Sequence, residues 1–540
     1  MNDPTATTNA TLTTNATLSA NRQIARAAGT VMLAFVIGQA AGLARSILVA
    51  NTFGITHDLD AFVAANRVSE TLFNLVAGGA LGSAFIPTFT ALLAKDERKP
   101  AWRLAAALAN LVVLTLSLLA ALAAIFAPQI ARYALAPGLA KDPRLFALTV
   151  DLLRIQLAST VLFGLGGLLV GILNSHQVFL IPALTPAMYQ FGLIFGVLAL
   201  APRMGIYGLA WGVVIGSALY LLVQFPALLK LPKVGRGWIP SLGLDNPSVR
   251  EVVFLMAPRL FGVAIVQLNF WVNTWLASQM SAGSVSAVTY GFMLMLMAQA
   301  VIAQSVATAM MPTLAAQYAL GRLNDVRSSL AASLRGVLFL SLPASLGLML
   351  LREPIIALLY QRGNFDARST QLVAWALLWY AAGLVGHCVM EILARAFYSL
   401  HDTKTPVLVG AAAMSLNVVF SFVFSALFTQ IGWMPHGGLA LANSLATALE
   451  AVTLFLLMRR RLKGIETRNV ANGFGQAVVA TLAMSLALIA WLQFAGRYSP
   501  WFMAMGGMAI GGLVYGLGVW ALRVPELHTL LQAIQRKLSR

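Results

Sequence analysis

MLAFVIGQAAGLARSILVANTFG, residues 32–54, is a run of 23 residues in which the only full charge is Arg45. A helix of about 20 apolar residues is long enough to cross the ~30 Å hydrocarbon core of a bilayer, so this stretch predicts a membrane-spanning helix. An arginine near the middle of such a helix costs roughly 2.5–3.5 kcal/mol even on insertion scales. Arg45 therefore needs a carboxylate on another helix, a water-filled cavity or an anionic ligand.

Similar apolar runs recur along the rest of the chain. Of the 540 residues, 59% are hydrophobic and 10% are charged, and the mean hydropathy is +0.80, whereas about 25% of the residues in soluble domains are charged. We therefore predict an all-α polytopic membrane protein. Charge clusters, prolines and short polar gaps divide it into fourteen predicted spans: 27–53, 61–93, 101–127, 146–173, 179–201, 206–230, 251–279, 284–317, 326–350, 368–399, 405–430, 437–458, 470–495 and 499–523.

The placement of lysine and arginine predicts how the chain is oriented. With the N-terminus inside, 24 of the 36 Lys and Arg residues fall in the cytoplasmic segments and eight in the outer loops. Cytoplasmic loops of membrane proteins carry this excess, so both termini are predicted to be cytoplasmic. The same placement accounts for the net charge of +18 without a nucleic-acid partner.

The chain also resembles itself. GSAFIPTFTALLA (82–94) is similar to ATAMMPTLAAQYA (307–319), and LNSHQVFLIPAL (173–184) is similar to FYSLHDTKTPVL (397–408). Two copies of six spans enter the membrane in the same direction, and two such lobes enclose a central cavity in transporters. The predicted segments are a disordered cytoplasmic tail (1–24), an N-lobe (25–230), a cytoplasmic linker (231–250), a C-lobe (251–460), two further spans (461–523) and a basic cytoplasmic tail (524–540).

Motifs for an enzyme are missing from the sequence. There is no G-x-x-x-x-G-K-[ST] phosphate loop, and the single cysteine, Cys388, excludes a disulfide framework and a cysteine-based metal cluster. We predict a membrane transporter with no cofactor and no metal. Its energy would come from the membrane potential, a proton or sodium gradient, or the gradient of its substrate.

The few charges within the predicted spans are the candidate binding residues. Arg45 has no acidic neighbour in its own helix, so it either pairs with Asp60 or Glu70 or faces the cavity and binds an anionic substrate. Arg67 and Glu70 are three residues apart and so are neighbours on one helix face. Arg259 reaches either the cavity from the other lobe or the cytoplasmic edge of the membrane.

One carboxylate stands alone in the second half of the chain. Glu450 lies in the middle of the predicted span 437–458. A lone carboxylate inside a membrane is a candidate for proton or sodium coupling, and the alternative is a hydrogen bond to a neighbouring helix.

Several motifs follow one another in order between residues 25 and 525: GLARSILVANTFG with DAF and AFIP after it, then GILNSHQVFLIPAL, LLYQRGNFD and ARAFYSLHDTKTPV. They resemble the MurJ (MviN) lipid II flippases of the MOP exporter superfamily. The resemblance implies a fourteen-span, two-lobe fold. It also implies translocation of an undecaprenyl-pyrophosphate-linked peptidoglycan precursor from the inner to the outer leaflet of the bacterial inner membrane by alternating access. Its implied partners are the lipid-linked anionic substrate, membrane lipids and cell-wall synthesis proteins.

By this resemblance, Arg45 falls on a family arginine, Asp60 on the aspartate of DAF, and Arg67 where a basic residue is common. Such residues are implied to hold the pyrophosphate and sugar headgroup. The sequence departs from the family pattern at six positions where charged residues are expected: Gln39, Ser46, Phe73, Gly78, Met293 and Leu296. Two alternatives therefore stay open. One is a flippase of another lipid-linked glycan, and the other is a MATE-like ion-coupled exporter that uses Glu450 or Asp60 as its coupling carboxylate.

Overall fold

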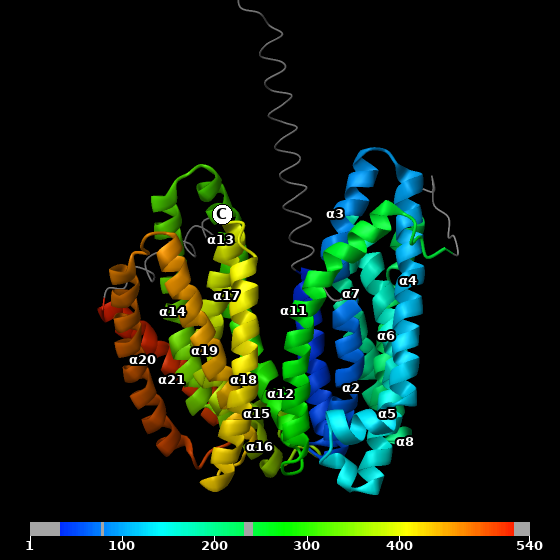
Figure 1. The fold of residues 1–540 in the computed structure, drawn as a ribbon. Helices are drawn as coiled ribbons and strands as arrows, with labels where there is room; N and C mark the ends of the chain where they lie inside the picture. The colour runs from blue at the N-terminus through cyan, green and yellow to red at the C-terminus, as the bar shows by residue number, and fades with distance from the viewer. Residues whose placement is uncertain (1–32, 77–79, 232–240, 523–540) are drawn as a thin grey trace, which may run out of the picture. The chain divides into compact units, whose positions relative to one another are not determined.

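The computed structural model describes residues 33–76, 80–231 and 241–522. These residues form helices joined by short turns, and no strand occurs within them (Figure 1). The predicted all-α class is therefore confirmed. The predicted tails 1–24 and 524–540 lie outside the described residues, as do positions 232–240 of the predicted linker.

Long apolar helices account for most of the chain. Eleven helices among the described residues are long and apolar enough to cross a membrane, and a twelfth span is formed by two helices that meet at a bend of 47°. The fourteen predicted spans are consistent with these helices once the segments 57–94 and 247–278 are added. The protein is thus a multi-pass membrane protein.

The described chain divides into two compact units, and the first consists of residues up to 49, 65–131 and 146–264. Its helices form from the apolar runs of the sequence. They are Leu33–Phe53, α2 (His57–Val76), α3 (Ala80–Ala94), α4 (Arg98–Ile125), α5 (Ala127–Gln129), α6 (Pro143–Ser175), α7 (Leu180–Phe195), α8 (Ala201–Met204), α9 (Ile206–Leu222) and α10 (Phe225–Lys230). The end of Leu33–Phe53 and the starts of α2 and α6 belong to the second unit. A π turn lies at Gly196–Leu200; a π turn at Ile130–Leu135 leads into the second unit, to which the 3-10 turn at Leu139–Lys141 belongs.

A packed core joins α3, α4 and α6 in the first unit. Phe85 and Phe89 of α3 are fully buried, and the ring of Phe89 meets that of Trp102 edge-on with centroids 6.1 Å apart. Leu108 and Leu173 belong to the same cluster. This cluster fixes the start of α4 against the other two helices.

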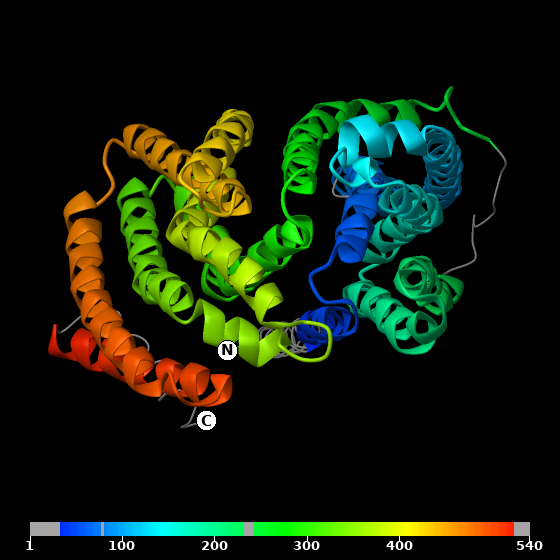
Figure 2. The ribbon, with the colours of Figure 1, turned by 90° about the horizontal axis from the view of Figure 1, so that it is seen from below.

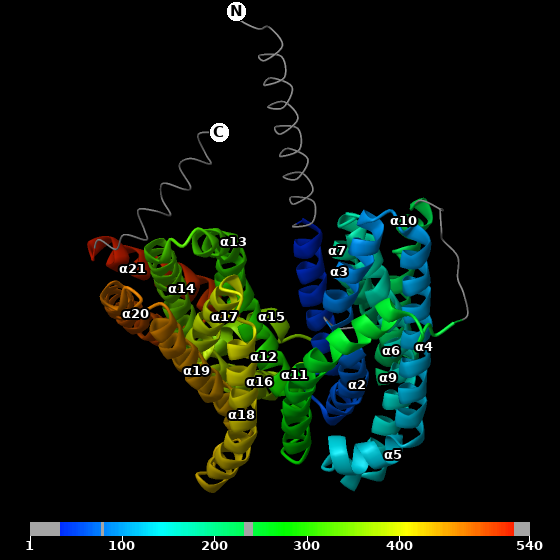
Figure 3. The same cartoon turned by 45° about the horizontal axis from the view of Figure 1, so that its top comes forward.

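Glycines allow α7 and α9 to approach each other closely. A Cβ atom added at Gly192 would lie 2.1 Å from Cα of Gly216, and one added at Gly196 would lie 2.7 Å from Cα of Gly212. Small residues four apart are the usual means by which membrane helices pack backbone against backbone. Figure 3 shows these helices together with α6 in the first unit.

The second unit consists of residues 50–64, 132–145 and 265 onwards. Its helices are again the apolar runs of the sequence. They are α11 (Pro247–Ser278, which begins in the first unit), α12 (Ser284–Gln299), α13 (Ser305–Ala319), α14 (Leu323–Leu350), α15 (Arg352–Tyr360), α16 (Ala367–Ala382), α17 (Leu384–Ser399), α18 (Lys404–Gln430), α19 (His436–Arg461), α20 (Thr467–Ala495) and α21 (Pro500–Ala521), with a π turn at Ala300–Gln304. The bent pair is α16 and α17.

The last two helices pack side by side and against α14 (Figure 2). Tyr515 of α21 is buried there, and its hydroxyl donates a hydrogen bond of 2.6 Å to the carbonyl oxygen of Phe339. A buried hydroxyl needs such a partner, so this contact fixes the register of α21 on α14. The division of the chain into lobes at residues 230 and 250 and at residue 460 stays our prediction.

Candidate functional site

A cavity of about 450 Å³ lies inside the first unit. Five helices contribute to it: Leu33–Phe53, α2, α6, α7 and α9. The lining residues are Arg45, Asn66, Ser69, Glu70, Phe73, Asn74, Ser159, Phe163, Pro186, Tyr189 and Tyr220. Arg45, the charge that the first apolar run has to accommodate, therefore faces a cavity.

Polar side chains of α2 line one part of the cavity. Asn66, Ser69, Glu70 and Asn74 lie three or four residues apart, and this spacing places them on one face of the helix. The carboxylate of Glu70 accepts a hydrogen bond from Nη1 of Arg67 at 3.0 Å, so the ion pair expected from their spacing is formed. Glu70 lines the cavity. Arg67 is not among the lining residues, but it is ion-paired with Glu70.

Aromatic rings form another part of the lining. Phe163 of α6 is central, with ring centroids 5.1 Å from Phe73, 5.0 Å from Tyr189 and 5.4 Å from Tyr220. Gly166 leaves the space for one of these rings, because a Cβ atom there would lie 2.4 Å from the ring of Tyr220. The four rings are thus held in place by their mutual contacts.

The cavity combines three kinds of binding group. The guanidinium of Arg45 donates paired hydrogen bonds in a planar fork that matches phosphate oxygens. The amides of Asn66 and Asn74 and the hydroxyls of Ser69 and Ser159 both donate and accept hydrogen bonds. The aromatic faces add flat apolar surface. Such a set suits an anionic ligand that also carries many hydroxyl or amide groups.

Asp60 does not line this cavity. Its buried carboxylate accepts three hydrogen bonds at the start of α12: from the backbone N–H of Gly283, from the backbone N–H of Ser286 and from the hydroxyl of Ser286, each at 2.7 Å. The first N–H groups of a helix have no partner within the helix, and a carboxylate there satisfies them. Asp60 thus caps α12 from a segment more than 200 positions earlier in the sequence.

Of the other two candidate residues, the structure places only Glu450, and it does not line this cavity. Arg259 falls in α11, but its side chain is outside the described residues. Glu450 of α19 is 8% exposed and lines a separate pocket of about 290 Å³ between α18 and α19, together with Leu408, Leu416 and Thr453. A Cβ atom at Gly410 would lie 3.2 Å from its Oε1, so α18 passes close to the carboxylate.

Several polar residues of the structure were not singled out from the sequence. Asn66, Ser69 and Asn74 carried a signal, because they recur with helical spacing around Glu70. A second group joins α11 to α18: Asn269 accepts hydrogen bonds from Asn273 at 3.2 Å and from Asn417 at 3.4 Å. Among the described residues, no cluster of three or more His, Cys, Asp or Glu side chains could hold a metal ion.

Solved structures show what the fold is similar to. A structure titled "Lipid II flippase MurJ, inward closed conformation" matches with a TM-score of 0.76 at 21% identity, covering 94% of this chain and 99% of that one. A multidrug resistance MATE family transporter of the MOP superfamily, in its inward-facing conformation, matches with a TM-score of 0.65 at 15% identity, covering 80% and 96%. At these identities the likeness concerns the fold.

Sequence comparisons identify the family. The family described as "Lipid II flippase MurJ" matches residues 49–508. The lipid II flippase MurJ of Burkholderia cenocepacia is 32% identical over 439 residues, which cover 81% of this chain and 84% of that protein. The probable lipid II flippase MurJ of Vibrio cholerae is 29% identical over 496 residues, which cover 90% and 92%. The chain therefore belongs to the lipid II flippase MurJ family.

Proposed function

We propose that this protein is a lipid II flippase of the bacterial inner membrane. It is a transporter and not an enzyme, and it moves the undecaprenyl-pyrophosphate-linked peptidoglycan precursor from the inner to the outer leaflet by alternating access. Membrane lipids and the lipid-linked substrate are its immediate partners, and cell-wall synthesis proteins are the proposed suppliers and users of that substrate.

The cavity around Arg45 carries this proposal, because it lies within a chain of the MurJ family. A guanidinium inside a membrane-spanning unit needs an anionic or watery environment. A pyrophosphate supplies the anion, and two of its oxygens fit the planar fork. The amides, hydroxyls and aromatic faces of the same cavity suit the sugar and peptide parts of the headgroup.

The cavity lining also bears on the positions where the family pattern has a charged residue and this sequence has none. Phe73, which stands where the family pattern has a charge, lies on the cavity wall beside Phe163. We propose that Arg45 binds the pyrophosphate and that Arg67 orients Glu70 towards the headgroup. Asp60 would contribute to the conformational change of the transport cycle, because its carboxylate binds the start of α12. Arg259 stays a predicted contact from the second lobe.

The experiment is complementation of a bacterium depleted of its own flippase. We expect the wild-type protein to restore growth and Arg45→Ala to fail at equal membrane levels, measured by immunoblot. Binding of labelled lipid II to the purified Arg45→Ala variant should weaken about ten- to a hundredfold, because a charged hydrogen bond contributes about 1.5–3 kcal/mol. Arg45→Lys should bind at an intermediate level, since it keeps the charge but loses the fork.

Arg203→Ala is the matched control, because Arg203 is an exposed arginine of the same unit that does not line the cavity. It should behave like the wild type in both assays. Growth restored by Arg45→Ala at matched levels would contradict the proposed role of Arg45. A well-expressed wild-type protein that binds no lipid II would contradict the flippase itself.

A second observation supports the coupling of lipid II transport to an ion gradient. Glu450 is a buried carboxylate that lines a pocket, and its side chain has no hydrogen-bond partner among the described residues. We propose that Glu450 takes up a proton or a sodium ion during the cycle. In proteoliposomes, Glu450→Gln should bind lipid II normally but transport it without responding to an imposed proton or sodium gradient.

Glu353 gives the control for this test, since its carboxylate is 60% exposed at the surface of α15. Glu353→Gln should respond to the gradient as the wild type does. If Glu450→Gln responds to the gradient as the wild type does, Glu450 is a packing residue and not the coupling residue.

A further inference from the structure

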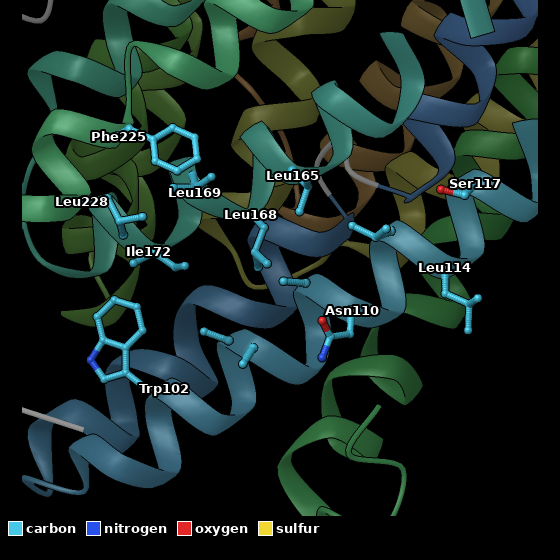
Figure 4. A pocket seen from close by; sticks show the side chains of 14 residues that line it. Trp102, Asn110, Leu114, Ser117, Leu165, Leu168, Leu169, Ile172, Phe225 and Leu228 are labelled. Carbon is cyan, nitrogen blue, oxygen red and sulfur yellow. The ribbon is translucent and has the colours of Figure 1, made fainter. Parts of the chain in front are cut away.

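An apolar groove of the first unit lies outside the cavity described above. It has a volume of about 670 Å³ and is formed by α4, α6 and the start of α10 (Figure 4). Leu165, Leu168, Leu169 and Ile172 of α6 lie across it from α4, and Phe225 and Leu228 lie at the end near Trp102. The groove exists because α4 has alanines at positions 105, 106 and 109, where longer side chains would fill it.

The groove adjoins an exposed apolar surface of the first unit. Along α4, Leu114, Leu118, Leu122 and Ile125 are each 43–65% exposed, and this stripe is far too apolar to face water. Leu114 belongs both to the stripe and to the lining of the groove. Because the groove is apolar and adjoins this apolar stripe, an apolar chain is the ligand that suits it.

The groove extends along α4 for somewhat more than the depth of one leaflet. Trp102 and Ser117 mark its two ends on α4, and at 1.5 Å per residue they are about 22 Å apart. One leaflet of a ~30 Å hydrocarbon core is about 15 Å deep. A single acyl chain and its glycerol linkage fit this length, whereas a polyprenyl chain of many isoprene units would extend beyond it.

The end near Trp102 carries the charge that a headgroup would meet. Lys99 and Arg103 flank Trp102 in the first two turns of α4, and Lys230 ends α10 two residues after Leu228. All three are exposed, and none of them is ion-paired within the described residues. On the orientation predicted from the sequence, this end faces the cytoplasm, where basic sites between helices bind anionic lipid headgroups.

The indole of Trp102 is fixed at this end. It is 8% exposed, and its ring packs between those of Phe89 and His176, each with a centroid distance of 6.1 Å. Tryptophan is enriched where the hydrocarbon meets the headgroup region. A rigid Trp102 therefore marks the depth at which an acyl chain would end and its headgroup would begin.

We propose that this groove binds one acyl chain of an anionic diacyl phospholipid from the inner leaflet, with the headgroup held by Lys99, Arg103 and Lys230. This bound lipid is separate from the transported substrate, which occupies the cavity around Arg45. The site depends on the alanine-lined wall of α4 for the chain and on the basic residues for the choice of headgroup.

The test uses the full-length protein in nanodiscs with two photoactivatable probes. The probes are a phosphatidylglycerol and a phosphatidylcholine that carry the same diazirine-labelled acyl chain. After irradiation, labelled peptides are mapped by mass spectrometry. We expect phosphatidylglycerol to label residues 102–117 and 165–172 several-fold more than phosphatidylcholine does. Equal labelling by both probes would overturn the proposal, because it would indicate ordinary surrounding lipid.

Matched variants separate the groove from its charged rim. Ala109→Phe fills the groove and should abolish this labelling, whereas Ala121→Phe, on the exposed side of the same helix, should leave it unchanged. Lys99→Gln with Arg103→Gln should remove the preference for phosphatidylglycerol, and Arg154→Gln with Arg203→Gln, two exposed arginines elsewhere in the unit, should not.

Two further outcomes would overturn the proposal. One is labelling that persists in Ala109→Phe, because the labelled site would then lie elsewhere. The other is loss of labelling when an equimolar amount of unlabelled undecaprenyl pyrophosphate is added, because the groove would then hold the tail of the transported lipid. Neither result would bear on lipid II binding at Arg45, which is measured separately.

Discussion

At the scale of single residues, Asp60 shows that one side chain can tie two distant segments together. Its carboxylate belongs to the segment 50–64, and its three hydrogen bonds satisfy the start of α12. The same region holds Asn364, whose backbone N–H donates to the carbonyl oxygen of Asn51 at 2.9 Å. The contacts of Asp60 make it a helix cap in this conformation.

We expect Asp60→Asn to lower the free energy of unfolding by about 1–3 kcal/mol. One oxygen of the carboxylate would become an NH₂ group that faces a backbone N–H, so at least one charged hydrogen bond is lost and a buried donor loses its partner. Thermal unfolding of the purified protein in detergent measures the effect.

Asp58→Asn is the control, since Asp58 lies two positions earlier and forms an exposed ion pair with Arg144 at 2.7 Å. Exposed pairs contribute about 0–1 kcal/mol. If both variants melt at the same temperature, the cap at α12 adds nothing to stability.

Sequence reasoning could find the charged residues of the site but not all of their neighbours. The spacing of Arg67 and Glu70 was enough to predict their ion pair, because neighbours three apart on a helix meet whatever surrounds them. The partners of Arg45 in the cavity lie on four other helices. No local pattern shows that Ser159, Tyr189 and Tyr220 face the same space.

At the scale of elements, hydropathy predicted the spans well and their breaks poorly. The predicted span 368–399 is two helices, α16 and α17, which meet at Gly383 with a bend of 47°. A hydropathy average over a window does not register such a bend. A Cβ atom at Gly383 would lie 2.3 Å from Oγ of Ser444, so α19 passes against the backbone at the bend.

The glycine contact between α7 and α9 gives a prediction at this scale. Gly192→Leu should destabilise the first unit by about 1–3 kcal/mol or more, because its Cβ would fall 2.1 Å from Cα of Gly216 and the helices would have to separate. The melting temperature in detergent should drop, and binding of lipid II should weaken because both helices line the cavity.

The matching control is Gly512→Leu in α21, where an added Cβ would meet nothing within 4 Å. Its melting temperature should stay close to that of the wild type. Equal stability of the two variants would mean that the close approach of α7 and α9 is not required.

At the scale of the whole molecule, the orientation of the chain is a prediction from charge alone. The single cysteine, Cys388, is buried, so a Cys388→Ala protein is a clean background for labelling. We expect Arg203→Cys to react with a membrane-impermeant maleimide in intact cells and Lys95→Cys to react only after the membrane is opened. Both positions are exposed, so access to the reagent decides the result. The reverse pattern would place the termini outside.

The two-lobe plan is a prediction from the sequence, made from the repeated segments around Pro87 and Pro312. Both prolines lie inside helices, in α3 and α13. What the repeat did not indicate is that the short segments 50–64 and 132–145 group with the second unit. Their contacts are between residues far apart in the chain, such as the hydrogen bond from Trp275 to the carbonyl oxygen of Tyr133, and periodicity carries no information about them.

The cap at Asp60 has a kinetic consequence. Under the proposed alternating access, a change of state that separates segment 50–64 from α12 breaks all three hydrogen bonds and exposes the carboxylate to water. Their strength then enters the activation barrier, where each 1.4 kcal/mol changes a rate about tenfold. Asp60 would set how often the transporter turns over, and Arg45 how tightly it holds its cargo.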